Sequence, residues 1–251
     1  MRIFDYDFFY STLRSGILLA SACFTLIGSS CSSIKNPSKF GLGEGVYRSS
    51  IEGSKAQSLY LEENGELLDF YPIEKRDREW SGSQSQSPLI TINKANPEFS
   101  QKLHLMKKSF DLDLITIPIK YRPAAAQVPS QINSVLNAAA YFGYRMDYYQ
   151  LDGTKTNPIG KINLAIDHFG FSLGGFLGIG NSELSPTTTL GNIPLEYEGI
   201  VLSKGIAAIF AVNKFTMGIG LGWDNLLDSN RSFWIYQNKP WLGLAIGINL
   251  N

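Results

Sequence analysis

The charged residues best placed to act together lie in two neighbouring stretches that alternate polar and apolar side chains. The first stretch carries two acids and a lysine and the second an arginine and an acid: Asp111, Asp113, Lys120, Arg145 and Asp147. If both stretches are strands that pair across their loop, the first two acids come level with Arg145 and Asp147, and Lys120 lies nearer the loop. Enclosed charges must be paired, because desolvating an unpaired charge is costly. We therefore predict a salt-bridge cluster that plugs the interior, with a proton or ion path or a small-ligand site as the alternative.

A second pair of residues, His168 and Ser172, has the types that nucleophilic catalysis uses. Four residues along a strand separate them by about 13 Å, too far for the histidine to activate the hydroxyl. We therefore expect His168 to be a polar residue at a strand end. His104 lies in a region without a clear pattern, and the sequence has no metal-ligand spacing, phosphate loop or nucleotide fingerprint. We predict no catalytic residue, no metal ligand and no cofactor.

The element that most clearly positions these side chains is residues 214–224, KFTMGIGLGWD. Side chains alternate across a strand, so one face is apolar, with Phe215, Met217, Ile219, Leu221 and Trp223. The other face is small or polar, with Thr216, Gly218, Gly220, Gly222 and Asp224. Residues 242–251 repeat the pattern. An apolar outside and a polar or crowded inside are typical of a transmembrane β-barrel.

Six strands of this kind follow one another from Phe110 onward: 110–122, 136–151, 161–180, 195–212, 214–224 and 241–251. In the first of them the apolar face changes between Leu114 and Ile115, which predicts a β-bulge, and Pro118 suits such a position. A bacterial barrel needs an even number of at least about eight strands. We expect a hairpin at residues 58–71, turning at Asn64-Gly65, to supply the other two. The alternative keeps this hairpin in the periplasm and takes the two strands from near Gly45 and Leu89.

Loop lengths predict how such a barrel is oriented. The loops at 123–132, 181–194 and 226–238 are long and would lie outside the cell, whereas the turn at Asn213-Lys214 is tight and would face the periplasm. Glycines leave one inner wall almost bare, which makes room for Tyr141, Arg145 and Lys120. At about eight strands side chains fill the interior, so we do not expect a wide pore.

Composition excludes other classes of protein. The chain has 251 residues, with 22 basic and 22 acidic side chains, so it has no net positive charge that would attract nucleic acid. Charged residues make up only 18% of it, beside 24 glycines, 15 Phe, 12 Tyr and 4 Trp. This mixture fits membrane-embedded strands better than a cytosolic enzyme.

The N-terminus has the pattern of an export signal. Residues 16–28 form an apolar run that follows Arg14 and is too short for a stable membrane anchor. We predict a signal peptide over residues 1–30, with a mis-assigned start or an uncleaved segment as the alternative, because Asp5 and Asp7 offset the basic residues. Ser29-Ser30-Cys31 resembles a bacterial lipobox, which implies lipidation of Cys31. It departs from that motif in having Gly28 three residues before the cysteine, and Cys23 is a second candidate.

From Phe110 to Asn251 the chain resembles the small outer-membrane β-barrels, of the type of the outer-membrane protein A transmembrane domain and the opacity proteins. The terminal strand WLGLAIGINLN carries the resemblance, although such barrels usually end on an aromatic residue and this chain ends Leu250-Asn251. The runs ITIPIKYRP and NKPWLGLAIGINLN resemble uncharacterised exported proteins of Bacteroidetes-type bacteria. The prediction is thus an all-β antiparallel transmembrane barrel of about eight strands. The signal covers residues 1–30. A tether, hairpin and linker over 31–109 form a short periplasmic extension, and residues 110–251 form the main part of the barrel.

The resemblance implies a bacterial outer-membrane envelope protein, structural or occluded, without enzymatic activity. Its partner would be outer-membrane lipid, with no nucleic acid and no protein partner that the sequence can name. One alternative is a periplasm-facing lipoprotein with a lipocalin-like barrel for an apolar ligand, in which Phe215, Met217, Ile219 and Leu221 would line the cavity. The other is an outer-membrane enzyme that modifies lipids.

Overall fold

The computed structural model describes residues 42–51, 56–76, 79–82, 87–97, 102–156, 158–160, 162–212 and 215–248. The expected signal segment, Cys31, the turn at 213–214 and residues 249–251 lie outside these ranges. Within them the chain is all-β, with strands, one 3₁₀ turn and no α-helix. None of the described residues belongs to a helix long and apolar enough to cross a membrane.

The strands, in chain order, are β1 (Gly45–Ile51), β2 (Gln57–Asn64), β3 (Leu67–Pro72), β4 (Glu74–Arg76), β5 (Glu79–Ser81), β6 (Ile90–Asn93), β7 (Lys102–Arg122), β8 (Gln131–Ser134), β9 (Asn137–Asp152), β10 (Ala165–Leu184), β11 (Tyr197–Val212), β12 (Phe215–Leu226) and β13 (Pro240–Ile248). The 3₁₀ turn η1 (Ser229–Ser232) lies in the loop between β12 and β13. β4 and β5 form a small separate hairpin, and the other strands belong to one sheet.

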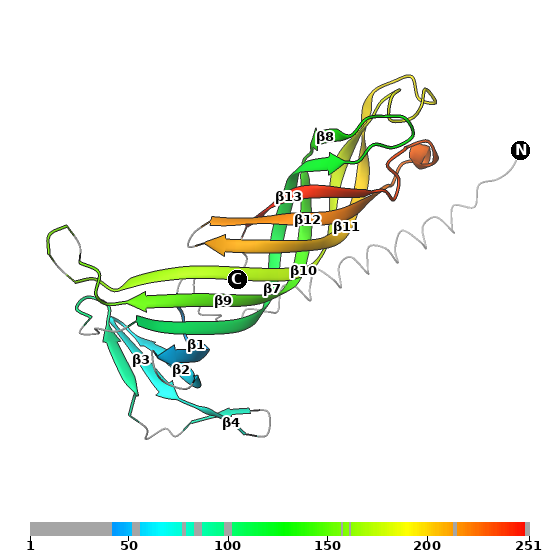
Figure 1. Ribbon diagram of the computed structural model, residues 1–251. Coiled ribbons are helices and arrows are strands. Elements are labelled where there is room, and N and C mark those ends of the chain that lie inside the picture. Colours follow the sequence, from blue (N-terminus) through cyan, green and yellow to red (C-terminus); the bar gives the residue numbers. More distant parts are fainter. Residues whose placement is uncertain are drawn as a thin grey trace, which may run out of the picture. The chain divides into compact units, whose positions relative to one another are not determined.

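Six strands of this sheet form a closed ring of antiparallel pairs (Figure 1). Their order is β7-β9-β10-β11-β12-β13, and β13 returns to β7. The closing pair runs from Leu242 opposite Tyr121 to Ile248 opposite Leu114. These are the six strands that the alternating pattern predicts from Phe110 onward, although β7 already begins at Lys102. Where the six overlap, each strand has a partner on both sides, so its backbone polar groups are satisfied within the sheet.

The ring contains six strands, and the predicted hairpin is not among them. The hairpin itself is confirmed: β2 and β3 pair around a turn at Gly65, whose φ of +63° suits glycine. It extends the sheet in the order β1-β2-β3-β6, with β1 on β7 at Leu103 to Met106. The strands near Gly45 and Leu89 form as well, as β1 and β6, and lie in this same extension. The expectation of about eight strands in the ring was wrong because β13 pairs directly with β7 and leaves no place for more.

The predicted bulge in β7 exists, but it lies a few residues later than expected. Thr116 is opposite Ile246 and Ile119 is opposite Leu244, so β7 has one extra residue between them. Ile115 and Ile117 are therefore buried inside the ring, and the face changes at Pro118, after which Lys120 points inward. The sequence prediction had placed both isoleucines outside.

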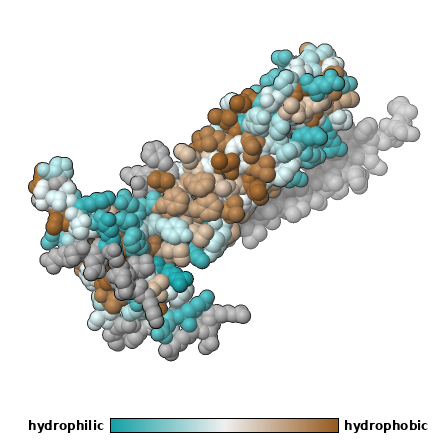
Figure 2. Space-filling view, viewed as in Figure 1, coloured by the Kyte–Doolittle hydropathy of each residue, from teal (hydrophilic) through white to brown (hydrophobic). Residues whose placement is uncertain are grey.

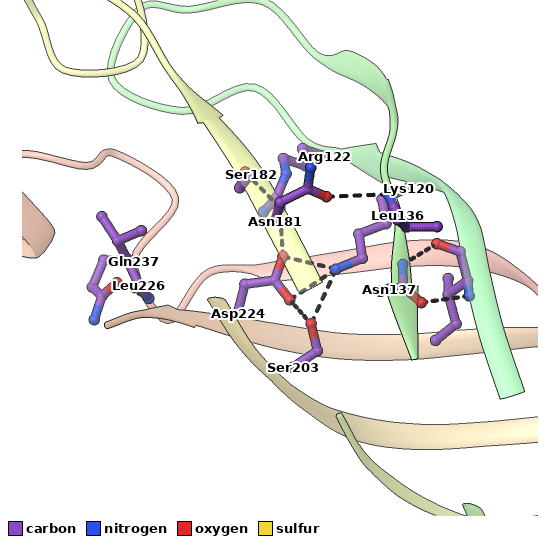
Figure 3. Close-up of polar contacts among 11 residues, drawn as sticks. Lys120, Arg122, Leu136, Asn137, Asn181, Ser182, Ser203, Asp224, Leu226 and Gln237 are labelled. Atoms are coloured by element: carbon purple, nitrogen blue, oxygen red, sulfur yellow. Dashed lines mark hydrogen bonds and ion pairs between the residues drawn. The ribbon is translucent and has the colours of Figure 1, made fainter. Parts of the chain in front are cut away.

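An asparagine side chain completes the hydrogen bonding at this bulge. Asn137 Nδ2 donates to the Ile117 carbonyl at 2.6 Å, and the Ile117 amide donates to Asn137 Oδ1 at 2.7 Å (Figure 3). The side-chain amide thus makes the hydrogen bonds that the backbone of a neighbouring strand would otherwise make, at the point where the chain passes from β8 to β9. The Pro118 carbonyl accepts from the Val135 amide at 2.9 Å. Proline is tolerated here because its carbonyl, the only hydrogen-bonding group of its backbone, has a partner.

The outside of the ring is apolar, as the alternation predicts. Every ring strand contributes exposed large hydrophobic side chains, including Leu112, Leu114, Phe142, Tyr144, Leu173, Leu177, Ile206, Met217, Ile219, Leu242, Leu244 and Ile246. Figure 2 shows hydrophobic residues gathered along the ring strands, with hydrophilic residues toward the two ends. Met217 and Ile219 are 58% and 60% exposed, so they do not line a cavity as the lipocalin-like alternative requires.

The inside of the ring holds a packed apolar layer in the middle of the strands. It consists of Ile115, Ile117, Ala139, Tyr141, Phe176, Ala207, Ile209, Trp241 and Ala245. Glycines on neighbouring strands make room for the largest members: a Cβ on Gly222 would lie 2.4 Å from the Trp241 ring, and one on Gly143 would lie 2.5 Å from the Tyr141 hydroxyl. Another apolar core, with Tyr47, Leu59, Phe70, Leu103 and Leu151 among its members, lies between the extension and the start of β7.

The inner glycines differ in how much space they have, which gives a test of this packing. Gly222→Ala should lower the free energy of unfolding by about 1–3 kcal/mol, because the new methyl group overlaps the Trp241 ring. Gly220→Ala is the matched control, since its Cβ would find its nearest neighbour at 3.6 Å, and it should change stability by less than about 0.5 kcal/mol. Urea unfolding midpoints measure both. Equal effects would contradict the packing around Trp241.

Candidate functional site

The buried polar residues of the ring form two groups on either side of the apolar layer. We call the first the Asp224 cluster: Lys120, Arg122, Ser182, Ser203 and Asp224. We call the second the Arg145 cluster: Asp111, Asp113, Arg145, Asp147 and His168. Along β7 the order is two acids, then Ile115 and Ile117, then Lys120 and Arg122, so apolar side chains separate the clusters.

Asp224 is the centre of the first cluster (Figure 3). Lys120 Nζ donates to both of its carboxylate oxygens, at 3.0 and 3.1 Å, and to Ser203 Oγ at 3.1 Å. Ser203 Oγ in turn donates to Asp224 at 2.6 Å. Arg122 Nη2 donates to the same carboxylate and, at 3.5 Å, to Ser182 Oγ. The three charged side chains are 0–1% exposed.

Three aromatic rings cover the cations of this cluster. Lys120 Nζ lies 4.4 Å from the centre of the Trp241 ring. The Arg122 guanidinium lies 5.1 Å from Trp234 and 5.2 Å from Tyr236, which both come from the loop between β12 and β13. Such contacts stabilise a buried cation through the negative face of the ring. They do not neutralise it, and a single carboxylate faces both basic side chains.

The loop between β12 and β13 folds back over this end of the ring. Its Trp234 and Tyr236 pack against Leu184, Val201 and Leu226. Gln237 Oε1 accepts from the Leu226 amide at 2.9 Å, and the Asn238 amide donates to the Asp224 carbonyl at 3.0 Å. Burial raises the pKa of Tyr236, against a smaller opposing effect of the Arg122 charge, so its hydroxyl keeps its proton at neutral pH.

A hydrogen bond at its start also holds this loop. The Tyr197 hydroxyl donates to Asp228 at 2.6 Å, and Asn230 Nδ2 donates to the Tyr197 oxygen at 2.8 Å. The Tyr197 hydroxyl and the backbone N–H of Asn230, which donates to Asp228 Oδ1 at 2.8 Å, hold the pKa of the Asp228 carboxyl below its usual value. The loop is therefore fixed at both ends over the Asp224 cluster.

In the second cluster, Arg145 and His168 share a carboxylate. Arg145 Nε donates to the two oxygens of Asp147 at 2.8 and 2.9 Å, and its Nη1 lies 3.9 Å from Asp111. His168 Nε2 is 2.7 Å from Asp147 Oδ1, and its ring stacks on Tyr149 with the ring centres 4.7 Å apart. Asp113 is buried on the same face of β7, 1% exposed.

The structure brings four of the five predicted interior residues together and separates the fifth. Asp111, Asp113, Arg145 and Asp147 lie in the Arg145 cluster, where β7 and β9 are paired. The expected level pairing is wrong, because Asp111 and Asp113 are opposite Gly143 and Tyr141, whereas Arg145 and Asp147 are opposite Ser109 and Lys107. Lys120 lies beyond the apolar layer. Its partner Asp224 was predicted to face inward, but its role was missed, because Lys120 and Asp224 come from strands that are not neighbours in the ring. No local pattern signals such a contact across the interior.

His168 and Ser172 have different partners and do not form a pair. His168 lies near the start of β10, is 4% exposed and contacts Asp147. The Ser172 hydroxyl hydrogen-bonds to the Tyr141 hydroxyl at 2.8 Å, on another level of the interior. Among the residues that the structure describes, no group of three or more His, Cys, Asp and Glu side chains could hold a metal ion.

A pocket of about 450 Å³ opens beside the Asp224 cluster. Arg122, Asn133, Ser182, Thr188 and Tyr236 are among the residues that line it, and Glu183 and Glu196 are exposed at its rim. These residues come from the ends of ring strands, from β8 and from the long loops that the sequence predicts to lie on one side. The lining is therefore polar, with a cation at its base.

Comparison of the chain with protein-family models, with curated proteins and with solved structures finds no match.

Proposed function

We propose that this protein is an outer-membrane envelope protein without enzymatic activity, whose ring spans the membrane as a closed, occluded β-barrel. The ring has six strands, two fewer than the eight of the smallest barrels on which the expectation from the sequence was based. The observation that carries the proposal is the exposed apolar outside of the ring, to which all six strands contribute. Soluble monomers rarely expose apolar patches larger than a few hundred Å². In a bilayer the same side chains would contact acyl chains, and the closed ring would leave no strand edge in lipid.

The interior supports an occluded barrel. The apolar layer around Phe176 and Trp241 separates the two polar clusters, and both of these members are almost completely buried. The layer contains one polar pair, the hydroxyls of Tyr141 and Ser172, which hydrogen-bond to each other. A proton or ion path would need a continuous series of polar groups or water through the layer. Six strands also enclose less space than eight, and at eight the interior is already filled by side chains.

Measurements in planar bilayers test the occlusion. The purified protein should give no stable conductance steps, because the apolar layer has no room for a hydrated ion. Phe176→Ala combined with Trp241→Ala opens this layer and is the comparison variant. Stable steps from the unmodified protein would contradict the occluded barrel.

Fractionation tests the location. The protein should remain in the outer-membrane fraction after a carbonate wash, and Cys31→Ser should remain there too, because the strands and not a lipid anchor would hold it. Release of Cys31→Ser into the soluble fraction would overturn the proposal and favour a lipid-anchored soluble barrel.

A further inference from the structure

Three residues that line the pocket beside the Asp224 cluster have buried hydrogen-bonding atoms with no partner among the described residues. These atoms are Nε and Nη1 of Arg122, the hydroxyl of Tyr236 and Oδ1 of Asn133. Arg122 and Tyr236 are 1% and 3% exposed, and all three residues line the pocket. Buried polar groups without partners are costly, so such a concentration in one place calls for an explanation.

The charge of the cluster points to the sign of the missing partner. Lys120 and Arg122 share the single carboxylate of Asp224, so two basic side chains face one acid in the cluster. Arg122 uses Nη2 for Asp224 and Ser182, and its Nε and Nη1 have no partner among the described residues. A guanidinium with two free donors matches the two oxygens of a carboxylate or phosphate group.

We propose that this pocket binds the oxyanion group, carboxylate or phosphate, of a small hydroxylated molecule, with Arg122 and Tyr236 as the donors to it. The hydroxyl groups of the same ligand would meet Asn133 Oδ1 and the Ser182 and Thr188 side chains that line the pocket. The exposed carboxylates of Glu183 and Glu196 also line the pocket and oppose the binding of an anion, so the interaction with Arg122 must outweigh this repulsion. This inference does not depend on the ring spanning a membrane.

The test uses the purified full chain in detergent and follows intrinsic tryptophan fluorescence, because Trp234 stacks on Arg122. Glucuronate and glucose 1-phosphate are the two charged probes, and they separate a carboxylate site from a phosphate site. Glucose is the neutral probe, and sodium chloride at matched ionic strength controls for salt effects. At least one charged probe should give a saturable change that glucose and chloride do not give.

Three variants locate the binding. Arg122→Gln should weaken it by at least about tenfold, and Tyr236→Phe, which removes only the hydroxyl, by about three- to tenfold. Arg122→Gln leaves Lys120 and Asp224 as a neutral pair, so it should still fold, and circular dichroism checks this. Arg231→Gln, which removes one positive charge from the same loop outside the pocket, is the matched control and should bind like the unmodified protein. The absence of a saturable change with both charged probes, or equal binding by Arg122→Gln, would overturn the proposal.

Discussion

Replacing Ile219 with arginine should lower the stability of the folded barrel in a bilayer by about 2–4 kcal/mol. Ile219 lies near the middle of β12, between Ala208 and Leu244 on the neighbouring strands, and its side chain is 60% exposed on the outside of the ring. In the proposed barrel it faces acyl chains, where a guanidinium loses its water without gaining a partner. Urea unfolding in lipid vesicles measures the loss.

The control for this experiment is Leu67→Arg. Leu67 is 37% exposed on β3, in the extension of the sheet outside the ring, so the same chemical change there should cost less than about 0.5 kcal/mol. If the two variants are equally stable, the outside of the ring does not face lipid. A large effect at Ile219 alone is specific to the membrane-facing surface.

Removing the carboxylate of Asp224, which lies inside the ring, should lower the stability of the protein by a similar amount. Asp224→Asn leaves Lys120 and Arg122 as two buried cations with no opposite charge between them, and breaking a buried ion pair in this way costs about 3–5 kcal/mol. Ser203 and Ser182 would retain hydrogen bonds to the cations but carry no charge. The unfolding midpoint in urea, compared with that of the unmodified protein, measures the cost.

The matched variant removes one of the two cations instead. Arg122→Gln leaves one lysine opposite one aspartate, so it should cost only about 1 kcal/mol, from lost hydrogen bonds and aromatic contacts. The difference between Asp224→Asn and Arg122→Gln therefore measures the charge imbalance. If Arg122→Gln is as destabilising as Asp224→Asn, the cluster is not organised around a single shared carboxylate.

Local patterns in the sequence were sufficient to predict the six ring strands and, apart from Ile115 and Ile117, which of their side chains face inward. The alternation around Met217 and Ile219 is strict because one face meets the interior and the other does not, and a one-residue slip would exchange them. The hairpin at Gly65 was equally predictable from the sequence, because its turn needs a positive φ and glycine adopts one easily. Both features depend only on residues that are close together in the chain.

The pairing of distant strands was harder to predict. Whether β13 closes on β7 or on another strand depends on contacts between residues more than a hundred positions apart, and nothing near Leu242 or Tyr121 encodes that choice. The position of the bulge was misjudged for a related reason: Ile115 and Ile117 are as apolar as the residues outside, and only the Asn137 side chain and the partner strand decide where the face changes.

The sequence predicted which charged residues lie inside the ring but not which of them contact one another. Charges such as Lys120 and Arg145 were expected inside the ring, and both are buried. The sequence could not show that an apolar layer separates them, or that Asp224 reaches Lys120 from a strand two places away in the ring. The pocket depends on a loop that places Tyr236 over Arg122, and the order of residues in a loop carries little information on such a contact.

The most direct test of the central claim is the gel mobility of the detergent-extracted membrane protein with and without boiling. A closed transmembrane barrel resists unfolding by the gel detergent at room temperature, so the unboiled sample should migrate as a compact band that shifts on heating. Ile219→Arg should weaken that compact band, whereas Leu67→Arg should not. A single band with no shift on heating, together with recovery of the protein in the soluble fraction, would contradict the membrane-spanning ring.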